Sequence, residues 1–359
     1  MTRKNFGLSW AIAVMVAVLA LVASACGGDD EETATTAGSE TTAGGTETTA
    51  AAMEMVSIKG ASMPNATGFP IWLAKDLGFL ADNGLDLEIV YFQSGAPMVE
   101  AGVQGSAWQV GWIGSPPGMT AAEKWGLILA GMEIEEGRQL GVWVRTAELG
   151  DQDPAEFLVG ADVMVPVNST LDQTLGACLD FFGLTRDDIN VVPLGPDDID
   201  ATFAAGQADA AAPFLRPGSP WVEDPDSYTM VCNAEMAGVS IYDPFIVHPN
   251  YWESNPEQSA AYIDAVYKAN EWILANRDAA VDKMAEFYVE IGTDASRAAV
   301  EADVDARTWY TLDSAIEAYE SGEALAGYNA LAEFFVSVGN WESVPDIQPA
   351  VDAGLEVLK

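Results

Sequence analysis

The chain has 359 residues and a formal net charge of −40, from 55 acidic and 15 basic side chains. Such an excess of negative charge excludes nucleic acid as a partner, because phosphate binding needs clustered Lys and Arg. A single histidine, His248, excludes a histidine-based metal site, and no phosphate-binding loop, nucleophile elbow or zinc-binding helix motif points to an enzyme. We therefore expect no metal, no cofactor and no catalysis.

The N-terminus has the pattern of an export signal. Arg3 and Lys4 precede an apolar run, Leu8–Ala25, that ends in small residues directly before Cys26. This end resembles the lipobox of bacterial lipoproteins, which implies cleavage before Cys26 and a lipid on its sulfur; an uncleaved membrane anchor is the alternative. Residues 27–53 are rich in Thr, Ala, Gly and acids, so we expect a disordered tether. Either way, the rest of the chain is expected to work outside the cytoplasm, in the periplasm or on the outer face of the cell membrane.

From residue 54 onward, short strands rich in branched and aromatic residues alternate with helices. Strand–helix alternation favours mainly parallel sheets flanked by helices, so the pattern predicts an α/β fold. Thr170 followed by Gln173 is typical of a capping box at a helix start. The expected strands are 55–60, 85–92, 108–113, 127–130, 161–167, 189–194 and 208–214, and the expected helices between them are 71–77, 98–103, 119–124, 170–182 and 197–205.

The last third of the chain is predicted to be helical and to cap the first sheet, because it has too little strand for a sheet of its own. Its expected helices are 256–276, 279–291, 294–304, 311–321 and 325–338. Two cysteines remain besides Cys26. In an exported protein, Cys178 and Cys232 are expected to form a disulfide, and two buried free thiols are the alternative.

Several short motifs, in order, resemble the periplasmic solute-binding proteins of the nitrate, sulfonate and taurine type, which serve ABC importers. They span about residues 56 to 338 and are AKDLGFL (74–80), SG (94–95), VG (110–111), GSPP (114–117), VPVNST (165–170), AAGQADA (204–210), YDPF (242–245) and NPE (255–257).

The resemblance implies a two-lobed clamshell of the type II kind, acting as a monomer with an ABC permease as its partner. One lobe would comprise 54–147 and 246–359, and the other 148–245. Two crossing segments, near 145–158 and 238–248, would join them. The small-molecule ligand would lie in the cleft between the lobes.

In such sheets, ligands lie at the loops after the strands, where helix N-termini offer N–H groups to anions. Aromatic rings could stack on the ligand, Arg216 could clamp a carboxylate or sulfonate, and Asp243 could cap a turn or bind a ligand amine. The same residues could instead serve as caps, turn formers, core or solvated surface. The candidates are Ser62, Asn65, Thr67, Ser94, Gly95, Gly114, Ser115, Ser169 and Thr170 on loops, the aromatics Trp112, Trp143 and Phe214, and the charged Arg216 and Asp243.

The expected function is therefore capture of a small organic solute, such as a sulfonate, taurine, nitrate or a similar small anion, for import. Two alternatives stay open. The ligand could be a neutral or cationic heterocycle, such as a thiamin-precursor pyrimidine, held between aromatic rings. The same fold could also act as a sensor or surface-interaction protein without transport.

Overall fold

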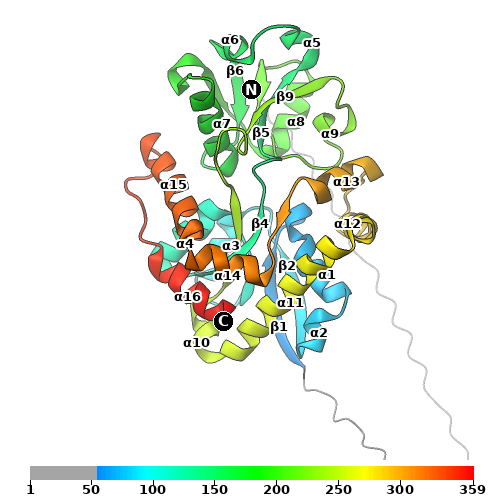
Figure 1. Ribbon diagram of the computed structural model, residues 1–359, viewed down its shortest axis with the longest axis vertical. Helices are drawn as coiled ribbons and strands as arrows, with labels where there is room; N and C mark the ends of the chain where they lie inside the picture. The colour runs from blue at the N-terminus through cyan, green and yellow to red at the C-terminus, as the bar shows by residue number, and fades with distance from the viewer. Residues whose placement is uncertain (1–54) are drawn as a thin grey trace, which may run out of the picture. The chain divides into compact units, whose positions relative to one another are not determined.

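The computed structural model describes residues 55–359, except for the side chain of Asp197. The first of its two sheets has the strand order β11-β4-β10-β3-β1-β2 (Figure 1). The first four strands along the chain run parallel, while β10 and β11 are antiparallel to them. The strands are β1 (Val56–Ser62), β2 (Leu85–Tyr91), β3 (Val110–Trp112), β4 (Ile128–Glu135), β10 (Tyr242–Val247) and β11 (Thr308–Trp309).

The helices of the first lobe come from both ends of the described chain, and apolar residues of both groups join the strands in one continuous core. Proline at the first or second position starts several of them, because its fixed φ suits the first turn. The first group is η1 (Ala66–Gly68), α1 (Phe69–Asp76), α2 (Phe79–Asp82), α3 (Gly95–Gly102) and α4 (Ser115–Trp125). The second is α10 (Pro249–Ser254), α11 (Pro256–Ala275), α12 (Arg277–Glu290), α13 (Arg297–Asp305), α14 (Leu312–Glu320), α15 (Glu323–Ser337) and α16 (Gln348–Leu358).

The second sheet has the order β7-β6-β8-β5-β9, with only β5 antiparallel to its neighbours. One face packs against the apolar stripe of α7, as the helical spacing predicts, and the other face packs against α8 and α9. The strands are β5 (Gly141–Arg145), β6 (Asp162–Val165), β7 (Asn190–Pro193), β8 (Ala210–Ala211) and β9 (Tyr228–Asn233). The helices are α5 (Thr146–Leu149), α6 (Pro154–Leu158), α7 (Thr170–Phe181), η2 (Arg186–Asp188), α8 (Pro196–Ala204) and α9 (Pro220–Glu223).

We call residues 141–233 the second lobe, and the segments 136–140 and 234–241 the crossings. The first crossing lies earlier than the predicted 145–158, because β5 belongs to the second sheet. The polar residues after β5 form the short helices α5 and α6 instead of a connection. The assignment of 141–147 to the first lobe is therefore wrong. The second crossing overlaps the predicted 238–248, but residues 242–245, predicted to belong to the second lobe, lie in β10 of the first sheet. The described residues as a whole form one compact unit.

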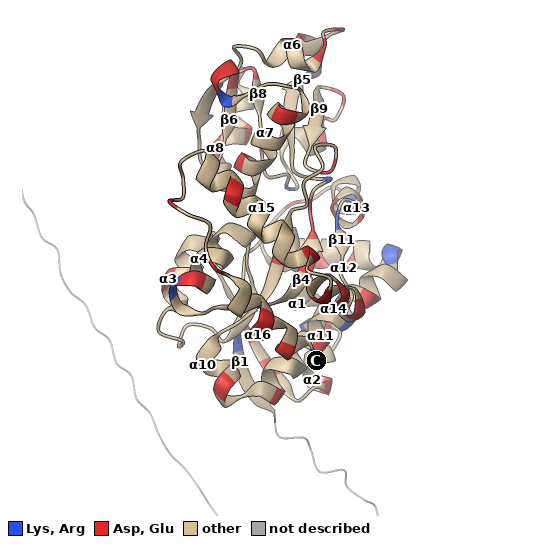
Figure 2. Ribbon diagram, turned by 60° about the vertical axis from the view of Figure 1, so that its left-hand side comes forward, with Lys and Arg blue, Asp and Glu red and all other residues tan. Residues whose placement is uncertain are grey.

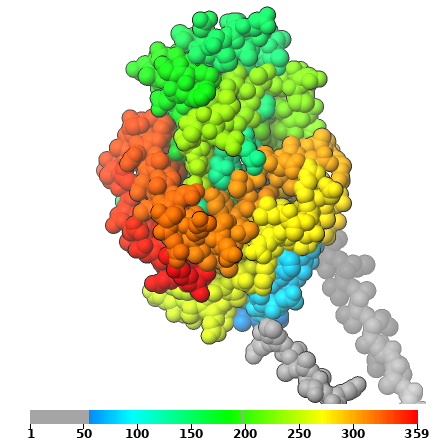
Figure 3. Space-filling model, viewed as in Figure 1, coloured from blue at the N-terminus to red at the C-terminus, as the bar shows by residue number. Residues whose placement is uncertain are grey.

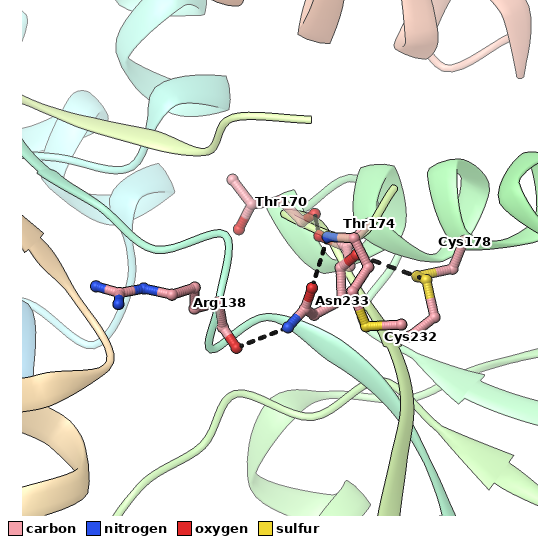
Figure 4. The surroundings of a disulfide bond; sticks show 7 residues. Arg138, Thr170, Thr174, Cys178, Cys232 and Asn233 are labelled. Carbon is pink, nitrogen blue, oxygen red and sulfur yellow. Dashed lines mark hydrogen bonds between the residues drawn. A yellow bond between two sulfur atoms is a disulfide. The ribbon is translucent and has the colours of Figure 1, made fainter. Parts of the chain in front are cut away.

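The disulfide joins Cys178 of α7 to Cys232 of β9, with 5.8 Å between their Cα atoms (Figure 4). Both side chains are buried, so the bond ties α7 to the strand that leads into the second crossing. Next to it, Asn233 donates a hydrogen bond from Nδ2 to the carbonyl oxygen of Arg138, at 3.2 Å. The two crossings are also linked to each other directly, by backbone hydrogen bonds such as that from the N–H of Glu235 to the carbonyl oxygen of Gly137, at 3.1 Å.

Charge is spread over the described surface without one dominant patch. Figure 2 shows Asp and Glu on helices of both lobes, with far fewer Lys and Arg. Exposed ion pairs such as Lys268–Asp264 occur on it, and pairs of this kind contribute little stability. Within residues 55–359, no helix has both the length and the apolar character needed to cross a bilayer.

Candidate functional site

The strand directions place the carboxyl ends of the parallel strands of both sheets next to the crossings. In the first sheet, β4 ends at Glu135 and β10 begins at Tyr242, so both crossings join the edge at which the parallel strands end. In the second sheet, β5 begins at Gly141 and β9 ends at Asn233, again at the edge where β6 and β8 end. The loops after the parallel strands of each sheet therefore lie toward the other lobe. Figure 3 shows the surface hollowed between the green second lobe and the orange helices.

The loop after β1 is held by its own hydrogen bonds. Ser62 is fully buried, and its Oγ accepts a hydrogen bond from Nε1 of Trp112 at 3.0 Å. Thr67 donates from its hydroxyl to Oδ1 of Asn65 at 2.6 Å. Trp112 is also buried, on β3. Ser62 and Trp112 therefore act as core residues that fix this loop.

The loop after β2 leads into α3. Ser94 is the N-cap residue and is exposed, and its side chain makes no capping hydrogen bond. Gly95 is buried against Pro117 of α4, where an added Cβ would collide with the proline ring. Gly95 thus has a packing role, which allows α3 and α4 to approach each other closely.

At the start of α4, a neighbouring carboxylate and two prolines reduce the number of N–H groups that an anion could use. The N–H of Ser115 donates to the carboxylate of Asp243, which also lies beside Gly114. The next two residues are prolines, which have no N–H. The hydroxyl of Ser115 donates to the carbonyl oxygen of Tyr242. Asp243 thus contacts the N-terminus of α4, and its predicted roles, to cap a turn or to bind a ligand amine, stay predictions.

At the start of α7, by contrast, backbone N–H groups stay available as hydrogen-bond donors. The N–H groups of Thr170 and Leu171 make no hydrogen bond within the described chain. Ser169 is the N-cap residue, but its hydroxyl donates backward to the carbonyl oxygen of Pro166. The predicted capping box between Thr170 and Gln173 is therefore wrong, because the helix begins one residue earlier than that box requires and Ser169, not Thr170, is the N-cap residue. Thr170 is buried at the helix N-terminus, where the macrodipole favours negative charge.

Ser115 of the first lobe and Thr170 of the second line one narrow gap beside the second crossing, which in this structure is too small to hold a water molecule. The sequence identified these two residues but missed the others. Gln173 and Tyr328 are buried polar residues at helical positions typical of core. The remaining lining residues are Ser240, Ile241, Tyr242, Gly327 and Leu331.

The aromatic and basic candidates of the second lobe form a cluster of their own. The Trp143 ring lies 6.2 Å from that of Trp221, between ring centroids. The Nε atom of Arg216 lies 3.3 Å from Oδ2 of Asp200, whose other oxygen accepts from Trp221. Phe214 is half-buried against the core of the second sheet. None of these candidates lines the gap.

A chain of buried polar groups runs behind the gap. Glu136, on the first crossing, accepts from Nε of Arg307 at 3.0 Å, and Arg307 also pairs with Asp303. Asp303 in turn accepts from the hydroxyl of Tyr288 at 2.5 Å. Burial and the neighbouring Glu136 raise the pKa of Asp243 well above its usual range. This network fixes the first crossing to α13 and contacts Asp243 at the start of α4.

Glu133 of β4 adds a further buried carboxyl group. It is fully buried, and neither of its oxygens has a hydrogen-bond partner within the described chain. Burial, followed by the nearby Asp243 and Glu136, raises the pKa of Glu133 well above its usual range. Arg307 is the cation that opposes these carboxylates. Within residues 55–359, no cluster of His, Cys, Asp and Glu is arranged to hold a metal ion.

His248 lies away from the crossings, at the end of β10. Its Nε2 atom lies 3.0 Å from the carbonyl oxygen of Gly102, and its Nδ1 accepts from the N–H of Asn250. Burial lowers the pKa of His248, so the ring is neutral and structural. A shallow polar pocket of about 610 Å³ lies beside it, lined also by Lys59 and Lys75.

Several known proteins that are similar to this chain are named as binding proteins. A putative ABC transporter periplasmic binding protein of Brachyspira hyodysenteriae is 22% identical over 298 residues, covering 79% of this chain and 83% of the relative. The taurine-binding periplasmic protein of Escherichia coli is 26% identical over 212 residues, 56% of this chain and 62% of that protein. Among solved structures, the alkanesulfonate-binding protein SsuA of Xanthomonas axonopodis pv. citri matches with a TM-score of 0.64 at 20% identity, covering 83% and 98% of the two chains.

The structural match confirms the predicted fold class, an α/β fold with two sheets flanked by helices and a helical C-terminal region. The sheets are mixed and not mainly parallel as predicted, because β10 and β5 pair antiparallel with both of their neighbours. The model of the family described as NMT1/THI5 like matches residues 65–280, which is more than half of the chain. The chain therefore belongs to the NMT1/THI5-like family.

Proposed function

We propose that this protein is the extracytoplasmic solute-binding component of an ABC importer, and that its ligand is a small organic solute with an anionic head group. The observation that carries the proposal is the gap that Ser115 and Thr170 share, one residue from each lobe. A ligand there would contact both lobes at once, which is what a clamshell needs in order to close on its solute.

The chemistry of α7 favours an anionic group. Two N–H groups, those of Thr170 and Leu171, are available at the positive end of a helix of 12 residues. The Thr170 hydroxyl adds a third donor on the same turn. By contrast, the alternative ligand, a heterocycle stacked between aromatic rings, loses support, because Trp112 is hydrogen-bonded in the core and Trp143 packs on Trp221.

The mechanism is closure about the two crossings. A ligand shifts the balance of open and closed forms only by its extra affinity for the closed form. Donors at the start of α7, together with packing against Ser115 across the gap, would supply that difference, since Thr170 and Ser115 approach each other only when the lobes are together. The closed form would then dock on the permease and release the solute.

The proposal places the protein outside the cytoplasm, attached to the membrane through a lipid on Cys26 and acting as a monomer. Cys26 and the tether lie outside the described residues. Transport is favoured over sensing because the relatives carry names of transport proteins. Conversion of the solute is not part of the proposal, because these relatives are named as binding proteins.

A thermal-shift screen of the full chain, in mild detergent, tests the proposal. The compounds are nitrate, bicarbonate, taurine, alkanesulfonates, small carboxylates and pyrimidines. A ligand at about 100 times its Kd adds roughly 2.7 kcal/mol to the stability of the folded form, which gives a clear rise in Tm. A rise with small organic anions is the expected result. A rise with pyrimidines alone would overturn the proposed ligand class, and no rise with any compound would overturn the function.

A further inference from the structure

One helix of the first lobe, α15, reaches the second lobe. The first half of α15 packs on the first lobe, where Gly327 lies against the ring of Tyr242 and Glu323 accepts a hydrogen bond from the Tyr242 hydroxyl at 3.1 Å. Its far end lies against α7 of the second lobe (Figure 1). The helix therefore bridges the lobes by packing alone, in addition to the two crossings that join them through the chain.

Gly176 of α7 and Phe334 of α15 form the closest contact of this bridge. Gly176 lies in the interior of α7, where glycine is a poor helix former. An added Cβ at Gly176 would collide with the ring of Phe334, so the ring occupies the place that a side chain would fill. The guanidinium group of Arg186 lies over the same ring, 5.7 Å from its centroid. The second lobe thus keeps a glycine where the first lobe packs on it.

A polar contact lies next to this packing. Asp172 of α7 is fully buried, and its Oδ2 atom accepts from Nδ2 of Asn340, in the loop after α15, at 3.4 Å. Within the second lobe, the same carboxylate accepts from the N–H of Asn168 at 3.0 Å and pairs with Arg186. Separation of the lobes therefore removes only Asn340, and Asp172 keeps both partners in its own lobe. We call this set of residues the latch; it comprises Asp172, Gly176 and Arg186 of the second lobe with Phe334 and Asn340 of the first.

The latch can be released without leaving a buried charge unpaired. Asn340 is exposed, and Arg186 and Phe334 are half-buried, so water replaces their contacts when the lobes separate. Breaking a buried ion pair would be far more costly, but the pair of Asp172 with Arg186 lies within one lobe and stays intact. The main cost of release is exposure of one face of the Phe334 ring, which corresponds to about a tenfold change in the ratio of open to closed forms.

We propose that the latch holds the two lobes together before a solute binds, and that its release opens the gap between Ser115 and Thr170. The latch lies beside that gap, because Gly327 and Leu331 of α15 line it. The apparent affinity of a ligand for the closed form rises with the fraction of chains that are already closed, so the strength of the latch sets the affinity for the solute. The inference rests on the closure of the lobes in the proposed function, and it does not depend on which solute binds.

Distances between two spin labels on the full chain, in mild detergent and without any ligand, test the inference. The labels are attached through ketone-bearing residues at the exposed Glu156 of the second lobe and Glu257 of the first, which avoids the native cysteines. Phe334→Ala removes the ring, and Gly176→Ala displaces it while favouring the helix α7. We expect one dominant distance in the wild type, and a second distance whose ratio to the first rises about tenfold in each variant. Phe181→Ala, an exposed change on α7 outside the latch, should match the wild type.

The double variant Gly176→Ala with Phe334→Ala shows whether the two residues act together. Because its added Cβ has no ring to displace, the double variant should open no further than Phe334→Ala alone, and additive opening would overturn the inference. The same distances in the wild type and both single variants would also overturn it, as would a wild type that already shows both distances in comparable amounts. Each of these results leaves the proposed function standing, which the thermal-shift screen decides separately. Melting curves confirm that each variant folds.

Discussion

Loss of the disulfide between Cys178 and Cys232 should destabilise the second lobe strongly. The bond closes a loop with a sequence separation of 54 residues. In the chain-entropy treatment, a loop of this size removes about 14 cal/mol/K from the unfolded chain, which corresponds to about 4 kcal/mol at 25 °C. That is a large share of the stability of an ordinary domain. The double variant Cys178→Ala with Cys232→Ala should lose this amount.

Urea unfolding, followed by far-UV circular dichroism and tryptophan fluorescence, measures the loss. Trp143 and Trp221 lie in the second lobe, but most of the 11 tryptophans lie outside it, so fluorescence reports the unfolding of both lobes together. The wild-type protein is compared with and without reductant, and the double variant serves as the control because reductant cannot change it. A transition that moves by less than about 1 kcal/mol on reduction would refute the entropic reasoning.

The same bond should affect ligand binding, because it holds α7. Cys178 lies on the helix whose first turns carry Thr170 and Gln173, and Cys232 lies on the strand entering the second crossing (Figure 4). Reduction should therefore weaken binding of whichever screened compound binds the wild type. Unchanged affinity in a reduced protein that stays folded would show that the bond does not position the site.

Three further predictions follow from buried contacts. Because burial raises the pKa of Glu133, the folded protein keeps a proton that the unfolded chain releases near pH 4. The free energy of unfolding should therefore fall as pH rises from about 5 toward neutrality. Urea titrations of Glu133→Gln should show a smaller fall with pH than the wild type, and an equal fall would contradict the assignment. Phe334 of α15 packs on Gly176 of α7. Phe334→Ala should therefore lower the free energy of unfolding by about 1–2 kcal/mol and speed hydrogen exchange in α7. Unchanged exchange would argue against a contact between the lobes there. Ser62→Ala should lower the free energy of unfolding in urea by about 1–3 kcal/mol, because it leaves the buried Nε1 of Trp112 without an acceptor. A loss no larger than that of an exposed serine-to-alanine control would count against that hydrogen bond.

The fold was largely predictable because periodic patterns are local. The apolar stripe of α7 and the proline-initiated α11 were found from spacing and punctuation alone. The helix α16 was missed, although it packs directly on β4. An added Cβ at Gly354 would collide with the carbonyl oxygen of Leu129, so this glycine marks a close approach that only the tertiary structure reveals. The position of β5 was misjudged because a strand's sheet is decided by long-range pairing.

The site was predictable only in part. Ser115 and Thr170 were found because loops after parallel strands are a general feature of such sheets. The start of α4 looked like an anion site, but Asp243, distant in sequence, takes its N–H group. Gln173 carried no signal of its own, because an amide at a helical position is ordinary until the gap that it lines is seen. Local chemistry identified the loops, and the long-range hydrogen bonds decided their roles.

The most direct test of the central claim measures binding to residues from both lobes. The compound with the largest thermal shift is titrated by calorimetry into the wild type and two variants, Ser115→Ala from the first lobe and Thr170→Val from the second, with the exposed Ser254→Ala as a control. The account predicts one ligand per chain and weaker binding in both variants, with the control unchanged. Equal affinity in all four proteins would contradict the claim that the solute is held between the lobes.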